Sequence, residues 1–252
     1  MSDNEREQLV DEALVLHVKN YQTADKYAIC FTRKHGKLRF IAYGARYVKN
    51  VQGRLLQPFA RLQIAVQQGQ KVDKLRSCEL VQVPQSLDVK QMAYAAVAAE
   101  LTAVFTEDRA PQEELYELLC STLAALTQRN PRIVVLSFAI KLLGLTGFAP
   151  EMQHCVCCGR ELTSGEAWFS PLQGGLVCQE CRAAYAGEGL ESCGEATREL
   201  WQWLQLLDYE HPASFRVRGA ELMELERLLY KFIFFQTDKP LNSLNFLSQM
   251  GL

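Results

Sequence analysis

In the stretch EALVLHVKNYQTADKYAICFTRKHGKLRFIAY (residues 12–43), apolar residues recur at every second position in three short runs. A period of two is typical of β-strands that bury one face. In the third run Leu38, Phe40 and Ala42 share one face, and the dipeptide His35-Gly36 marks the turn before it. The stretch therefore predicts three consecutive antiparallel strands.

Two more runs of the same kind follow, RLQIAVQ (61–67) and DKLRSCELVQV (73–83). Five strands in about 70 residues predict a small antiparallel barrel such as the OB-fold, although strand count alone does not single that fold out. We assign residues 1–82 to this barrel. Within its first strand, the alternation places Leu14, Leu16 and Val18 on one face.

The pattern then becomes helical, with apolar residues spaced for helices rather than strands. Three helices are expected within 88–108, 111–130 and 131–148, two more at about 194–208 and 219–235, and a last turn or two near 241–249. The fold class is therefore α+β, with a helical domain formed by residues 83–153 and 183–252. A four-cysteine zinc finger, residues 154–182, is inserted into it.

The zinc finger is predicted from the segment CVCCGRELTSGEAWFSPLQGGLVCQEC (155–181), which contains two C-x2-C pairs. Two residues between cysteines let a tight turn direct both sulfurs at one point, and two such turns complete a tetrahedron around Zn²⁺. The predicted ligands are Cys155, Cys158, Cys178 and Cys181. Cys157 and His154 are possible competitors for these positions, but Cys157 gives a poorer spacing, and we expect neither to bind the metal. The alternative to a metal site is a group of unliganded or redox-active thiols.

A zinc ion held by these four cysteines is expected to be structural. Catalytic zinc usually keeps a coordination position open, whereas four thiolates close the shell. The chain also has no G-x-x-x-x-G-K-[ST], no G-x-S-x-G and no H-E-x-x-H motif. We therefore expect no enzymatic activity, with one structural Zn²⁺ as the cofactor.

The composition is that of a globular chain, with 252 residues, 48% hydrophobic and 22% charged. No apolar run approaches the roughly 20 residues that span a bilayer. The chain begins with an acidic, polar segment rather than a basic segment followed by an apolar one, so we expect a cytoplasmic protein without a membrane partner. In that compartment nine cysteines indicate a metal site and separate thiols rather than disulfides.

The charge is unevenly distributed. Residues 17–76 carry 13 Lys and Arg against only Asp25 and Asp73, although the whole chain has a formal net charge of −2. A basic segment on an acidic remainder indicates a polyanion partner. A solvated strand surface rich in lysine and arginine explains the same count equally well.

Cations and one aromatic residue of the barrel form the candidate DNA-binding set. Lys37, Arg39 and Tyr43 share the face of their strand opposite Phe40, and such interleaving supplies charge for phosphates and a ring for bases. The full set is Arg33, Lys34, Lys37, Arg39, Tyr43, Arg46, Lys49 and Arg54. The alternative is that Tyr43 is an edge aromatic and that the lysines only confer solubility.

Three ordered segments carry a family resemblance: residues 12–59, which end in GAR and LQPF motifs; residues 142–181, a leucine-rich helix followed by the cysteines; and the closing KPLNSLNFLSQM (239–250). Together they resemble the bacterial recombination mediator family RecO. Asn242 and Leu244 stand where that family commonly has basic residues, which weakens any polyanion contact by the closing segment.

The resemblance implies an N-terminal OB-fold, a helical domain and a zinc finger. It also implies binding to single- and double-stranded DNA, annealing of complementary strands, and contacts with RecR and the single-stranded-DNA-binding protein during RecA loading. We accordingly expect a nucleoid-associated cytoplasmic repair protein. The competing hypothesis is a zinc-containing protein-interaction scaffold that does not contact DNA directly.

Overall fold

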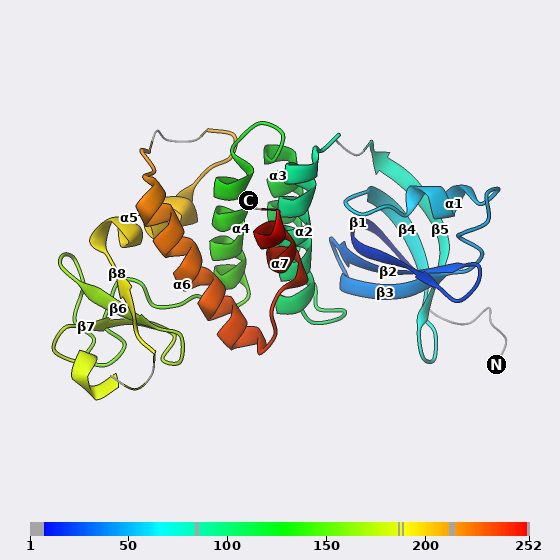
Figure 1. Ribbon diagram of the computed structural model, residues 1–252. Helices are drawn as coiled ribbons and strands as arrows, with labels where there is room; N and C mark the ends of the chain where they lie inside the picture. The colour runs from blue at the N-terminus through cyan, green and yellow to red at the C-terminus, as the bar shows by residue number, and fades with distance from the viewer. Residues whose placement is uncertain (1–7, 84–85, 186, 188, 212–214, 251–252) are drawn as a thin grey trace. The chain divides into compact units, whose positions relative to one another are not determined.

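The computed structural model describes residues 8–83, 86–185, 187, 189–211 and 215–250. The chain forms two compact units: the first contains the described residues up to Pro131 and Met250, and the second runs from Arg132 to Gln249. Figure 1 labels their helices and strands. The first unit contains a β-barrel with one short helix, and two longer helices. The second contains the remaining helices and the cysteine module. The predicted boundary between residues 82 and 83 lies directly before positions 84–85, which are outside the described residues.

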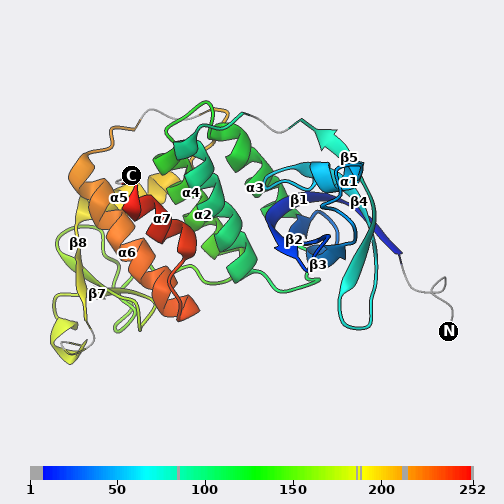
Figure 2. The same ribbon diagram turned by 45° about the vertical axis from the view of Figure 1, so that its right-hand side comes forward.

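Five strands close into a barrel in the order β1-β2-β3-β5-β4, seen in Figure 2. The strands are β1 (Gln8–Tyr21), β2 (Asp25–Thr32), β3 (Gly36–Ala42), β4 (Arg61–Gln67) and β5 (Asp73–Gln82), with the short helix α1 (Val51–Leu55) between β3 and β4. The long strand β1 pairs with β4 through its first half and with β2 through its second half. The barrel is an OB-fold, and the predicted α+β class is confirmed.

The barrel core confirms most of the predicted strand faces. Leu38, Phe40 and Ala42 are buried together inside it. The expected face of β1 was wrong, because a register shift between Val15 and His17 interrupts the alternation. Val15 enters the core, whereas Leu14 is buried on the other side of the strand. A β-bulge of this kind rotates the following side chains by one position, which no simple period of two anticipates.

Two helices complete the first unit, α2 (Val89–Phe105) and α3 (Glu113–Ala125). The Asp88 carboxylate accepts a hydrogen bond from the Gln91 backbone amide, and the Gln91 side chain accepts one from the Asp88 backbone amide. This capping box explains why α2 begins there. The β2–β3 hairpin packs tightly on the segment between the helices: a Cβ added to Gly36 would lie 2.0 Å from the carbonyl oxygen of Ala110. Tyr116 of α3 donates a 3.0 Å hydrogen bond to Glu12 of β1.

The second unit contains the helices α4 (Pro131–Leu145), α5 (Glu195–Leu206), α6 (Gly219–Thr237) and α7 (Asn242–Gln249). It also contains a sheet in the order β7-β6-β8, with β6 (Ala167–Ser170), β7 (Gly175–Cys178) and β8 (Glu191–Cys193). In Figure 1, α6 runs from the top of this unit past α4 and α5. Ser137 of α4 donates to the Leu204 carbonyl of α5 at 2.7 Å. Within the described residues, no helix is both long and apolar enough to span a bilayer.

Candidate metal centre and nucleic-acid interface

The four predicted cysteines meet at one point. The Sγ atoms of Cys155, Cys158, Cys178 and Cys181 all lie within 4.8 Å of one another. Four sulfurs at ~2.3 Å from a central zinc would be about 3.8 Å apart, and Cys158 Sγ lies 3.8 Å from Cys178 Sγ. The donor set and its spacing therefore fit a metal ion, and all nine cysteines are free thiols rather than disulfides.

Two turns of the backbone direct these sulfurs inward. In the first, the Gly159 amide donates to the Cys155 carbonyl at 2.8 Å, and Gly159 adopts a φ of +73° that a glycine accepts without strain. The second turn follows β7, and the Cys178 amide donates to Cys155 Sγ at 3.3 Å. The strands β6 and β7 are joined by a turn at Gly174, which has a φ of +71°.

The surroundings of Cys155 favour its thiolate form. Burial acts against the charged sulfur, but backbone amides of Cys178, Cys158 and Cys157 outweigh it and lower the pKa of Cys155 to about 6. The pKa of Cys178 is raised, chiefly by burial, and that of Cys181 is raised, chiefly by hydrogen bonds with Cys157 and Cys178. A metal ligand must be deprotonated, and Cys155 is the cysteine whose surroundings favour that form by themselves. Cys157 is exposed and lies outside the group of four, and the side chain of His154 lies 3.6 Å from Glu151 instead.

The candidate DNA-binding residues fall into two groups at opposite ends of β3, which are about 20 Å apart at ~3.3 Å per residue. The group at the hairpin end is largely neutralised. Arg33 pairs with Glu113 at 3.2 Å and with Glu117 at 2.5 Å, and Arg39 pairs with Asp108 at 3.0 Å. Lys34 is the exposed cation of this group that forms no ion pair within the described residues.

Lys37 has a different role from the one expected. Its side chain is only 4% exposed. The ammonium group donates to the carbonyl oxygens of Ala103, at 2.6 Å, and Thr106. These carbonyls belong to the last turn of α2, where helix carbonyls lack partners and the dipole favours a cation. Lys37 therefore caps the C-terminal end of α2, and we no longer assign it as a phosphate ligand. Its burial lowers its pKa.

The group at the other end of β3 remains available. Tyr43, Arg46, Lys49 and Arg54 are all exposed on the segment that leads from β3 into α1. Among the described residues, Arg46 bonds only to main-chain carbonyls, with Thr23 at 2.8 Å, so no carboxylate there neutralises its charge. Within the described part of the chain, neither Lys49 nor Arg54 forms an ion pair. We name Tyr43–Arg54 the basic loop.

The structure adds two residues that sequence reasoning missed. Lys74 of β5 lies over the ring of Tyr43, with Nζ 5.9 Å from the ring centroid. The parallel pairing of β3 with β5 brings them together, because Ile41 lies opposite Lys74. Tyr47, in the middle of the basic loop, is 66% exposed. Its position directly after Ala45-Arg46 in a glycine-containing loop was the available sequence signal.

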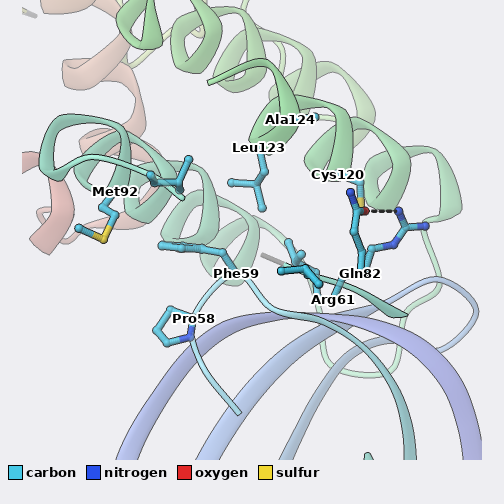
Figure 3. Close-up of a pocket in the computed structure, with 11 residues that line it drawn as sticks. Pro58, Phe59, Arg61, Gln82, Met92, Cys120, Leu123 and Ala124 are labelled. Atoms are coloured by element: carbon cyan, nitrogen blue, oxygen red, sulfur yellow. Dashed lines mark hydrogen bonds between the residues drawn. The ribbon is translucent and has the colours of Figure 1, made fainter. Parts of the chain in front are cut away.

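An apolar pocket of about 180 Å³ lies elsewhere on the first unit, between the barrel and its two helices (Figure 3). Its labelled lining includes Pro58, Phe59, Met92 and Leu123. Its arginine, Arg61, is paired with Glu12 and bonds to Gln82, so it offers no free charge to a phosphate. The pocket therefore differs in chemistry from the basic loop and suits an apolar group.

Known protein families match both the barrel and the part of the chain that contains the helices and the clustered cysteines. Residues 6–84 match the family described as Recombination protein O N terminal, and residues 86–245 match Recombination protein O C terminal. The chain belongs to the RecO family. The family resemblance read from the sequence is thereby confirmed.

Two relatives in the RecO family illustrate the extent of the similarity. The DNA repair protein RecO of Symbiobacterium thermophilum is 31% identical over 245 residues, which cover 95% of this chain and 96% of that protein. The DNA repair protein RecO of Moorella thermoacetica is 29% identical over 243 residues, which cover 95% of this chain and 90% of that protein. Each of the two matches thus extends over both units of this chain.

Replacing Cys155 by serine is expected to abolish most metal binding and to lower stability by several kcal/mol, because the metal-binding free energy of such knuckles is folding free energy. Metal content by mass spectrometry and the urea midpoint check this. The matched control is Cys157→Ser, which should keep about one metal ion per chain. A Cys155→Ser protein with full metal content and an unchanged midpoint would contradict the ligand assignment.

Replacing Lys37 by glutamate is expected to destabilise the first unit by about 2–4 kcal/mol, since a carboxylate would face the carbonyls that end α2. Lys34→Glu, at the exposed hairpin tip, is the control and should change stability by less than about 0.5 kcal/mol. Urea unfolding followed by circular dichroism measures both. Equal midpoints for the two variants would refute the capping role of Lys37.

Proposed function

We propose that this chain is a DNA-binding mediator of recombinational repair that acts without catalysing a reaction. The observation that carries the proposal is the basic loop, where exposed cations without acidic partners gather around exposed tyrosines. Membership in the RecO family supports it, because relatives in that family are named DNA repair proteins.

Binding relies on the cations that the fold leaves unpaired. Lys49, Arg54 and Lys74 neutralise phosphates of either single- or double-stranded DNA, because the phosphate backbone is common to both. Arg46 adds a charge held in place by carbonyls of the β1–β2 turn. Arg33, Arg39 and Lys37 contribute little, since their charges are engaged within the first unit.

Annealing of complementary strands follows from this arrangement without any bond-making step. Two DNA strands repel each other through their phosphates, and a protein that neutralises part of that charge lowers the repulsion. In this proposal the chain promotes annealing in this way. Together with RecR it helps to load RecA, and it contacts the single-stranded-DNA-binding protein. Its place of action is the nucleoid in the cytoplasm.

The metal in the four-cysteine site is proposed to be one structural Zn²⁺. Four thiolates fill a tetrahedral shell and leave no position for a substrate or a water molecule. The bound metal would join the turn that carries Cys155 and Cys158 to the end of β7, where Cys178 lies. The small apolar cluster around Val177 is too limited to hold these segments together by itself. The zinc would therefore stabilise the module and supply no chemistry.

A charge-reversal variant tests the proposed function. Lys49→Glu, Arg54→Glu and Lys74→Glu together should weaken single-strand binding more than about tenfold at low salt. They should also reduce the slope of log K against log salt by about 2, since each lost phosphate contact removes roughly 0.7. Fluorescence anisotropy with a labelled oligonucleotide measures both quantities.

The control carries the same change of net charge at exposed positions outside the basic loop: Lys90→Glu, Arg216→Glu and Lys239→Glu. It should keep nearly full affinity and the original salt slope. A wild-type protein without salt-sensitive DNA binding would instead favour a protein-interaction scaffold, for which the apolar pocket beside Phe59 is the candidate contact.

A further inference from the structure

The tip of the basic loop exposes two adjacent apolar side chains. Tyr47 is 66% exposed and Val48 is 88% exposed. Single exposed apolar residues are common on protein surfaces, so exposure alone assigns no role. Tyr47 differs from an ordinary surface tyrosine because hydrogen bonds fix the backbone of the loop on either side of it.

The backbone of the basic loop is fixed at several points. The Gly44 amide donates to Asp25 at 2.8 Å, and the Arg46 amide donates to the Ala24 carbonyl at 2.9 Å. Asn50 donates to the Gly44 carbonyl and accepts from Gly53, so one side chain links the two ends of the loop. The loop is therefore ordered before any partner arrives.

Glycine at two positions permits this closure. A Cβ on Gly53 would lie 1.8 Å from the Ala45 carbonyl oxygen, so α1 packs directly on the loop backbone. A Cβ on Gly44 would lie 3.2 Å from the ring of Tyr47. The ring therefore rests beside Gly44 while most of its surface faces solvent.

We infer that Tyr47 is a stacking platform for an unpaired base of single-stranded DNA, with Val48 as an exposed apolar contact next to it. An exposed aromatic ring, on a hydrogen-bonded loop that also carries Arg46, Lys49 and Tyr43, meets the two requirements of such a platform: a ring for the base and cations for the flanking phosphates. A platform fixed in advance loses little conformational freedom on binding.

Tyr47 then distinguishes single strands from duplex. In a duplex both faces of each base are covered by neighbouring base pairs, and the ring has nothing to stack on. The phosphates remain accessible in both forms. The cations of the basic loop thus serve either form of DNA, and Tyr47 adds affinity only where a base is unpaired. This inference rests on the proposed DNA binding and names the element that gives it strand preference.

The test compares three labelled probes of equal length with the full-length protein: homothymidine, an abasic strand and a duplex. Tyr47→Ala should weaken binding of homothymidine about fivefold to hundredfold, the range for loss of one stacked base. Binding of the abasic strand and of the duplex should not change. Tyr47→Phe, which keeps the ring, should bind all three like the wild type.

The outcomes separate this inference from the proposed function. Unchanged homothymidine affinity in Tyr47→Ala, or an equal loss on all three probes, overturns the stacking role while salt-sensitive DNA binding stands. Failure of the wild-type protein to bind any probe overturns the proposed function and the inference together. Loss confined to homothymidine, restored by Tyr47→Phe, supports the inference.

Discussion

The dual pairing of β1 is the constraint on which the first unit depends. One strand of 14 residues pairs with β4 along its first half and with β2 along its second half, and the register shift after Val15 accommodates the change of partner. This closes the barrel, in which the seven residues of β3 place its two ends about 20 Å apart. One end is occupied by α2 and the segment that follows it, and the other end carries the basic loop. The division between structural and available cations follows directly from that separation.

Charge in this protein is therefore divided between folding and binding. Lys26 donates to the Gly53 and Leu56 carbonyls at the end of α1 and, like Lys37 at the end of α2, caps a helix. Arg61 holds Glu12, which also accepts from Tyr116. The strongly basic composition of residues 17–76 consequently overstates the charge that is both exposed and unpaired. Among the described residues, cations without acidic partners gather on the basic loop and on the neighbouring part of β5, whereas Lys34 is the exposed and unpaired cation of the hairpin end.

The sequence was sufficient for features that depend on local periodicity and spacing. The five strands and the grouping of the four cysteines are both of this kind, and the structure confirms them. It was insufficient for features set by tertiary contacts. Lys37 and Arg39 alternate with core residues as surface cations do, and only the approach of α2 shows that one is buried and the other paired. The partnership of Lys74 with Tyr43 depends on the parallel β3–β5 pairing, which joins segments that are distant in sequence.

We propose that the basic loop, rather than the β2–β3 hairpin, is where the first unit meets DNA. Hydrogen–deuterium exchange with and without a saturating single-stranded oligonucleotide tests it most directly. The account predicts that peptides covering Tyr43–Arg54 and the start of β5 gain protection, while those covering Arg33–Lys37 do not. Protection confined to the β2–β3 hairpin, with the basic loop unchanged, would contradict it.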